Sequence, residues 1–258
     1  MRFSIPITLT PAESNTNSKL YLPINYVGPF LRGIKVGLQT SDYGFYEEMY
    51  TKGHKVKNFA LSAVFPHAKI EHKKIYVKDG PKNMIMHFTA SDPRLALGYF
   101  NAFKQMQLSH CMHFNDQVNY TVHNPILESE TKIKHNAIVV KTMSPIVVSD
   151  GPKGNYLNLA TENPNDHTAD IALYTESIKA SLKHHIDKPE LLPLIDTLEI
   201  LPVKTKATVL NMFGNYTPAT TGTIALQADP RLLTEILQSG IGSKRGCFNG
   251  MLKVIEQI

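Results

Sequence analysis

Apolar and polar residues alternate in two series of segments that have the same order. The first series predicts elements at 2–9 (strand), 24–40 (helix), 58–65 and 74–90 (strands), 92–107 (helix) and 110–122 (strand). The second series predicts elements at 137–148 (strand), 168–185 (helix), 195–205 and 207–227 (strands), 229–238 (helix) and 250–256 (strand). Each series therefore has the order βαββαβ, which is the ferredoxin-like pattern.

A short internal repeat supports this division. The sequence Asp-Pro-Arg-Leu occurs at 92–95 and again at 229–232, each time between a strand-like segment and a helix-like segment. Aspartate caps the free N–H groups at a helix start, and proline suits the first helical position because it has no N–H to satisfy. We therefore predict a tandem duplication of the α+β class, with an N-terminal ferredoxin-like domain at 1–127 and a C-terminal one at 128–258.

Composition narrows the class of partner. Hydrophobic residues make up 42% of the 258 residues, which is enough for packed cores. Lys and Arg number 27 against 22 Asp and Glu, and the net charge of +5 indicates either simple solubility or an anionic partner such as nucleic acid. No apolar run approaches the roughly 20 residues of a membrane helix. Cys111 and Cys247 lie far apart, which favours a reducing cytoplasm and no metal site.

The segment 240–251 carries the strongest chemical signal. It has four glycines within eleven residues, between the last predicted helix and the last predicted strand. Glycine permits positive φ, and successive N–H groups in such a loop form an anion-binding nest, to which a basic tip adds charge for a phosphodiester. The alternative is a glycine-rich hairpin with solvated lysine and arginine. The candidate phosphodiester contacts are Gly240, Gly242, Ser243, Lys244, Arg245 and Gly246.

This loop resembles the C-terminal glycine-rich loop of the CRISPR-associated repeat-RNA endoribonucleases, the Cas6 family of the RAMP superfamily. The glycine–apolar–glycine sequence at 240–242 and the basic stretch at 243–245 match the family pattern. The end of the loop departs from it, because this chain has Phe248-Asn249-Gly250 and Gly246 stands earlier. The Ser-Pro-Ile sequence at 144–146 and the strand at 58–62 also resemble the family, in the same order along the chain.

The resemblance implies tandem ferredoxin-like domains and metal-independent cleavage of CRISPR precursor RNA within its repeats, with no cofactor. In that chemistry a ribose 2′-hydroxyl attacks the scissile phosphate while a base and an acid move protons and a cation offsets charge. The products are a cyclic phosphate and a 5′-hydroxyl. The implied partners are the repeat RNA and subunits of a CRISPR effector complex, and the sequence leaves a homodimer open.

The family's usual catalytic histidine follows the first helix, and here that position falls on Tyr50, or on Met49 if a one-residue gap is allowed. His54 lies four residues later in the same connection and has an ordinary pKa near 6.5, suited to proton exchange at neutral pH. Tyr50 acts only as a weak acid or base at its ordinary pKa of about 10. We predict His54, Tyr50 and Lys55 as catalytic residues, with Lys52 holding phosphate. The alternative is that His54 is an ordinary loop histidine and catalysis is lost.

Three functions therefore stay open. The first is the endoribonuclease, and the second is an RNA-binding subunit of the same fold that does not cut. The third is an unrelated ferredoxin-like enzyme or small-molecule-binding domain, which leaves the basic loop unexplained. Two further histidine clusters are read as structural. These are His110-Cys111-His113 on a strand, and His184-His185 at a helix C-terminus, where positive charge is favourable.

Overall fold

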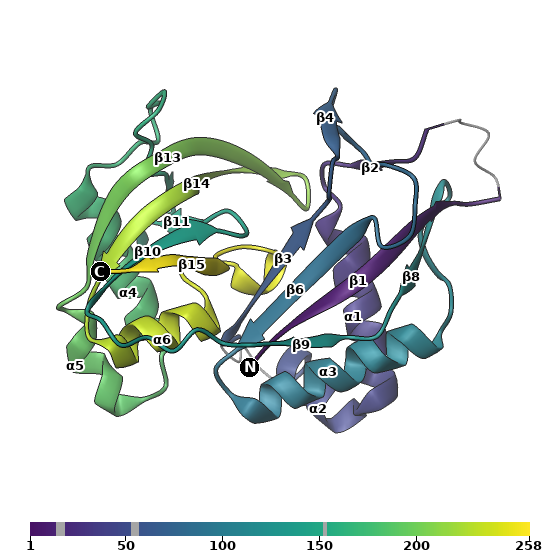
Figure 1. Ribbon diagram of the computed structural model, residues 1–258, viewed down its shortest axis with the longest axis horizontal. Coiled ribbons are helices and arrows are strands. Elements are labelled where there is room, and N and C mark those ends of the chain that lie inside the picture. The colour runs from purple at the N-terminus through teal and green to yellow at the C-terminus, as the bar shows by residue number, and fades with distance from the viewer. Residues whose placement is uncertain (14–18, 53–56, 152–153) are drawn as a thin grey trace.

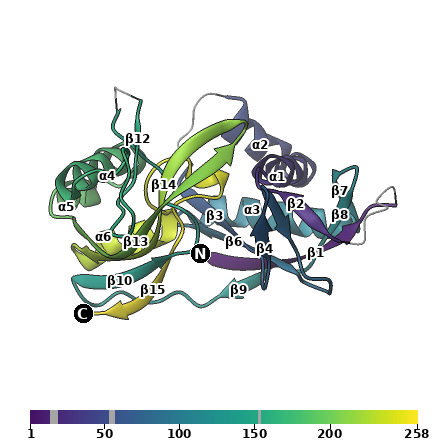
Figure 2. The same cartoon turned by 90° about the horizontal axis from the view of Figure 1, so that it is seen from above.

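The computed structural model describes residues 1–13, 19–52, 57–151 and 154–258. It consists of two halves that lie side by side, each with an antiparallel sheet and its own helices (Figure 1). The segment that contains β9 (Ile126–Glu128) runs from one half to the other (Figure 2). The predicted pair of ferredoxin-like folds is confirmed, while the exact boundary between residues 127 and 128 stays a prediction.

The first sheet has the strand order expected of a ferredoxin-like unit. Its strands, in spatial order, are β3 (Phe59–Val64), β6 (Met84–Ala90), β1 (Arg2–Pro11), β8 (Val118–Val122) and β7 (Met112–Asn115), and β9 also pairs with β1. The two main helices, α1 (Val27–Ser41) and α3 (Pro93–Leu108), pack against each other beside this sheet (Figure 1). A further helix, α2 (Tyr43–Tyr50), follows α1 directly.

The second sheet repeats this order. Its strands are β13 (Glu199–Met212), β14 (Asn215–Gln227), β10 (Ala137–Thr142) and β15 (Leu252–Gln257). Its helices are α4 (Ile171–His185), the short α5 (Leu192–Ile195) and α6 (Pro230–Ser239), with 3₁₀ turns at Pro189–Leu191 (η2) and Arg245–Cys247 (η3). Two strands, β11 (Val148–Ser149) and β12 (Tyr156–Leu157), form a separate small pair.

The predicted caps are present in both halves. The carboxylate of Asp92 accepts a hydrogen bond from the Arg94 N–H, and that of Asp229 accepts one from the Arg231 N–H, at 2.8 Å in each case. The repeated Asp-Pro-Arg-Leu sequence therefore begins α3 and α6, as its chemistry predicts. Across the described ranges, none of the helices has the length and apolarity that crossing a membrane requires.

Four predicted strands are corrected by the structure. The segment 74–90 forms two strands, because a turn with Gly80 at φ +134° separates β5 (Lys74–Tyr76) from β6. β5 belongs instead to a small sheet with β2 (Tyr21–Pro23) and β4 (Lys69–Glu71). The segment 110–122 is the β7–β8 hairpin rather than one strand. The turn predicted near residue 206 lies at 213–214, since β13 continues to Met212.

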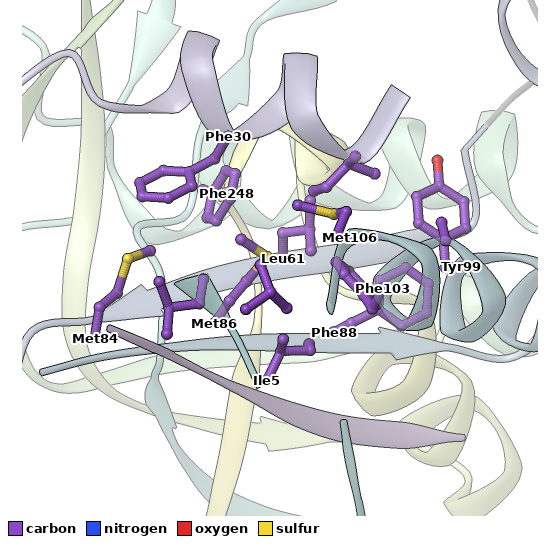
Figure 3. Packing of buried hydrophobic residues seen from close by; sticks show 14 of the residues in the cluster. Ile5, Phe30, Leu61, Met84, Met86, Phe88, Tyr99, Phe103, Met106 and Phe248 are labelled. Carbon is purple, nitrogen blue, oxygen red and sulfur yellow. The ribbon is translucent and has the colours of Figure 1, made fainter. Parts of the chain in front are cut away.

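The core of the N-terminal half contains one residue of the C-terminal half. Phe248 is 3% exposed and packs with Phe30 and Tyr26, the ring centroids lying 6.5 and 6.0 Å apart. Figure 3 shows Phe248 beside Phe30, among the methionine and aromatic side chains of the first sheet and its helices. Because Phe248 belongs to the segment 240–251, that segment is anchored between the two halves.

Candidate functional site

A pocket of about 340 Å³ opens where the two halves meet. The first half contributes α1, the end of α2 and the residue Lys57 just before β3. The second half contributes the end of α4, the β13–β14 turn and the 3₁₀ turn at 245–247. The described residues that line it are Leu31, Lys35, Tyr50, Lys57, His185, Phe213, Lys244, Arg245, Gly246 and Cys247. It therefore joins Tyr50 to the basic part of the glycine-rich segment, two regions that the sequence had singled out separately.

The glycines of the segment 240–251 shape it against the protein. Gly240, Gly242 and Gly250 have φ values of +82°, +77° and +71°. A Cβ at Gly240 would lie 2.6 Å from the Cβ of Ala60, and one at Gly250 would overlap the carbonyl oxygen of Ile241. These glycines are needed because the loop folds back tightly on its neighbours, and none of the three lines the pocket.

The expected anion nest is not formed along the whole loop. The N–H groups of Ile241, Ser243, Cys247, Asn249 and Gly250 donate to carbonyl oxygens within the protein, at 2.7–3.4 Å. The nest was predicted from the glycine content of the loop. In the structure these N–H groups are not available to an anion, because they hold the loop in place. The part of this segment that lines the pocket is the stretch from Lys244 to Cys247.

Arg245 does not extend from an exposed tip, which corrects the sequence interpretation. It is 3% exposed, and its guanidinium donates to the carbonyl oxygens of Ser239 and Gly240 at 3.0 and 3.4 Å. A third bond reaches Oδ1 of Asn58 at 3.4 Å. Burial lowers the pKa of Arg245 to about 10. The side chain thus satisfies the end of α6 and links it to the first half, while one side of the residue borders the pocket.

Lys244 is the exposed basic residue of this segment. It adopts a left-handed conformation with φ +55°, and its ammonium lies 4.5 Å from the centroid of the Tyr156 ring. Ser243 is half-buried, and its N–H donates to the carbonyl oxygen of Val147 at 2.7 Å. Lys244 is therefore the loop residue best placed to reach an anion at the pocket mouth.

Tyr50 lies at the last position of α2. Its hydroxyl is 2.7 Å from the hydroxyl of the fully buried Tyr99, and burial raises the pKa of Tyr50 to about 12. Two ammonium groups lie over its ring, that of Lys57 at 4.0 Å from the centroid and that of Lys35 at 4.9 Å. The aromatic face stabilises these cations, so Tyr50 contributes a platform for positive charge.

Three lysines give the pocket its charge. Lys35 comes from α1, Lys57 precedes β3, and Lys244 comes from the glycine-rich segment. Burial lowers the pKa of Lys57, and the nearby charge of Lys35 lowers it further. None of the described lining residues is an aspartate or glutamate. An anionic ligand such as a phosphodiester would relieve the repulsion between these ammonium groups.

His185 also lines the pocket, at the C-terminal end of α4. Its Nδ1 lies 3.1 Å from Oγ of Ser181, one turn earlier on the helix. Burial lowers the pKa of His185 to about 4, with the Arg245 and His184 charges acting in the same direction. The sequence interpretation treated His184 and His185 alike, as residues at a helix end. The structure distinguishes them, because His184 is exposed and His185 is half-buried and lines the pocket.

The remaining predicted residues are placed as follows. Lys52 is exposed and pairs with Glu47 at 2.7 Å, and it is not among the residues that line the pocket. His54 and Lys55 lie outside the described residues. Sequence reasoning missed Lys35, Lys57, His185 and Phe213. Within the part of the chain that the structure describes, no three His, Cys, Asp or Glu residues are grouped to hold a metal ion, and His110 and Cys111 are exposed.

Comparison with known proteins matches this geometry to one family. Residues 128–254 match the family model described as CRISPR associated protein Cas6, C-terminal. No curated protein matches the chain in sequence. Solved structures resemble the chain over its full length at low sequence identity.

Three such structures illustrate the likeness. A Cas6-related protein from Pyrococcus furiosus is 18% identical with a TM-score of 0.76, covering 100% of this chain and 99% of that chain. A RAMP protein binding different RNA substrates is 18% identical with a TM-score of 0.72, covering 98% and 100%. A Cas6 product complex is 14% identical with a TM-score of 0.59, covering 99% and 100%.

The fold and the pocket define a protein of tandem ferredoxin-like domains with a basic site at their junction, and the same fold occurs in a RAMP protein. The match to the Cas6 C-terminal family model covers residues 128–254, which make up most of the second half of the chain. The resemblance to the Cas6 family that the sequence indicated is therefore confirmed.

Proposed function

We propose that this protein is a metal-independent endoribonuclease that cleaves CRISPR precursor RNA within its repeats. The observation that carries the proposal is the pocket at the domain junction, where Lys35, Lys57 and Lys244 converge among described residues that include no carboxylate. Such a site suits a phosphodiester and places positive charge where the transition state gains negative charge. The match to the Cas6 C-terminal family model supports repeat RNA as the substrate.

The reaction uses the nucleophile of the substrate. The 2′-hydroxyl loses its proton and attacks the adjacent phosphorus, and the bond from phosphorus to the 5′-oxygen breaks as that oxygen takes a proton. The ammonium groups of Lys35, Lys57 and Lys244 offset the charge on the phosphate oxygens during this step. The products are a 2′,3′-cyclic phosphate and a 5′-hydroxyl end.

The predicted catalytic residues keep distinct roles in this proposal. His54 is the residue that the resemblance offers for proton exchange with the RNA, and Lys52 and Lys55 are proposed to hold phosphate. Tyr50 supplies the aromatic face beneath Lys57 and Lys35, because its hydroxyl is occupied by Tyr99. Replacing His54 by alanine tests that role: loss of cleavage with intact RNA binding would support it, and an unchanged single-turnover rate would remove His54 from the mechanism.

The RNA contacts of the glycine-rich segment are proposed for Lys244, Ser243 and Gly246, with Gly240 and Gly242 shaping the loop. Arg245 contributes by holding this segment in place. The proposed partners are repeat RNA and the subunits of an effector complex that receive the guide RNA, within antiviral defence in the cytoplasm. A homodimer is left open.

A second function is favoured by the state of Tyr50. A tyrosine with a pKa of about 12 stands at the position where the family usually has its histidine. A relative that has lost this histidine would bind repeat RNA without cutting it. The same pocket serves both functions, since phosphate binding needs the lysines and not the acid or base.

Cleavage of a synthetic repeat RNA in EDTA tests the proposal. The control is the same RNA with a single 2′-deoxy nucleotide at the cut site. Cutting of the intact RNA, with binding but no cutting of the deoxy RNA, supports 2′-hydroxyl attack. Binding of both RNAs without any cutting supports the silent relative. Binding that does not depend on salt would contradict both, because phosphate contacts release counterions.

A further inference from the structure

His185 is the histidine found among the described residues that line the pocket. It comes from α4 in the C-terminal half, far in sequence from the residues 50–55 to which the resemblance assigns catalysis. It is half-buried, and it faces the same space as Lys35, Tyr50 and Lys57 of the other half. Its neighbour His184 is exposed and does not line the pocket.

The surroundings of the ring determine which nitrogen is free. Nδ1 lies 3.1 Å from Oγ of Ser181, so this nitrogen is engaged in a hydrogen bond on the helix itself. A neutral ring that donates from Nδ1 to this hydroxyl oxygen leaves Nε2 unprotonated. In the neutral ring Nε2 then carries the lone pair, which is the form needed to accept a proton.

Positive charge faces the ring from several elements. Arg245 and His184 contribute directly to lowering its pKa, after burial itself, and Lys35, Lys57 and Lys244 line the same pocket. The ring is therefore neutral at pH 7 before RNA binds. A bound phosphate offsets the surrounding cations and makes protonation of Nε2 easier at the moment when a proton must be accepted.

We propose that His185 is a catalytic residue that accepts the proton of the attacking 2′-hydroxyl. This inference rests on the proposed endoribonuclease function. The O–H bond breaks as the N–H bond forms at Nε2, the 2′-oxygen bonds to phosphorus, and the bond from phosphorus to the 5′-oxygen breaks. The 5′-oxygen takes a proton from the ammonium of Lys57, and exchange with water returns both side chains to their starting states.

The test compares His185→Ala with His184→Ala, a matched control from the adjacent position on α4. Single-turnover cleavage of repeat RNA is expected to slow by about 100-fold or more in His185→Ala, the usual contribution of a general base. The rate should change far less in the control, which keeps the His185 ring and loses only the neighbouring His184 charge. Affinity for the uncleavable 2′-deoxy RNA should be equal in both variants. Added imidazole should restore part of the rate of His185→Ala, which a purely structural loss would not permit.

The pH dependence of the rate gives a second readout. In the unaltered protein the cleavage rate should fall as the pH is lowered and Nε2 becomes protonated. The residual cleavage rate of His185→Ala should not show this fall at low pH. A rate of His185→Ala equal to that of the control overturns the inference and leaves the proposed function standing. If the unaltered protein does not cleave the RNA, the proposed function is overturned, and the proposed proton transfer to His185 is overturned as well.

Discussion

The hydroxyl groups of Tyr50 and Tyr99 lie 2.7 Å apart and connect the end of α2 to the buried centre of the N-terminal half. Tyr99 is completely buried, and its ring stacks on Phe88 with centroids 4.8 Å apart. The ring of Tyr50, in turn, lies beneath the ammonium groups of Lys57 and Lys35 in the pocket. The core thereby fixes the position of the cations in the pocket.

Replacing Tyr50 by phenylalanine separates the platform from the hydroxyl. The variant keeps the ring beneath Lys57 but leaves the buried hydroxyl of Tyr99 without this partner. We expect a loss of about 1–3 kcal/mol in the free energy of unfolding, measured by denaturant titration, and an unchanged rate of single-turnover cleavage. A large fall in the rate, with RNA affinity intact, would instead make the Tyr50 hydroxyl an acid or base.

Replacing Lys57 by alanine is expected to weaken RNA binding. The side chain is one of three lysines of the pocket, and each phosphate contact that is lost reduces the salt dependence of binding by about one unit of slope. Lys132→Ala is the control, because Lys132 is exposed and is not among the residues that line the pocket. The slope of the logarithm of the binding constant against the logarithm of salt concentration is measured from about 50 to 200 mM salt. Equal slopes for the two variants would place Lys57 outside the RNA contact.

Local signals made most of the fold predictable. The two βαββαβ series follow from apolar periodicity, and the Asp-Pro pairs at 92–93 and 229–230 mark helix starts because a cap depends on adjacent residues only. The errors concern where strands begin and end. The interruptions at 79–81 and 115–116 contain turn-type residues that the longer predicted strands passed over. β13 continues past residue 206 because Lys206 pairs with Thr221 across the hairpin, a contact that the alternation of side chains does not reveal.

The pocket was predictable only in part. Tyr50 and Lys244 were identified from the family pattern, but their proximity depends on Phe248 entering the other half. The burial of Arg245 could not be read from its neighbours, because a basic residue among glycines usually lies in solvent. Its partners Ser239 and Asn58 come from two different halves of the chain.

The state of His185 predicts how stability changes with pH. Its pKa falls from the ordinary 6.5 to about 4 on folding, so the unfolded chain binds more protons between these values. The free energy of unfolding should therefore decrease as the pH is lowered from about 6.5 towards 4, the window that these two pKa values define. His185→Asn should show a shallower decrease than the unaltered protein.

The control for this pH effect is His184→Asn. His184 is exposed, and its replacement removes only the part of the His185 pKa shift that the His184 charge causes, so the decrease should stay steeper than in His185→Asn. His87 contributes in the same direction, since burial lowers its pKa as well, and it is present in both variants. Identical slopes for the two variants would show that the His185 ring is solvated in the folded protein.

Gly250→Ala tests whether the glycines build the loop or bind the RNA. Gly250 has φ +71°, and an added Cβ would overlap the carbonyl oxygen of Ile241. Gly214→Ala is the matched control, because Gly214 has φ +84° and nothing lies within 4 Å of its added Cβ. Both variants lose about 1 kcal/mol or more from the positive φ, and only Gly250→Ala adds the steric cost.

We therefore expect thermal unfolding to occur at a clearly lower temperature in Gly250→Ala than in Gly214→Ala. RNA affinity should fall in Gly250→Ala alone, since the loop that carries Lys244 would shift while the hairpin turn at Gly214 would not. Equal melting temperatures with a selective loss of affinity would assign Gly250 to the RNA contact itself. Because its N–H already donates to the carbonyl oxygen of Pro145 at 2.8 Å, the structural outcome is the one we expect.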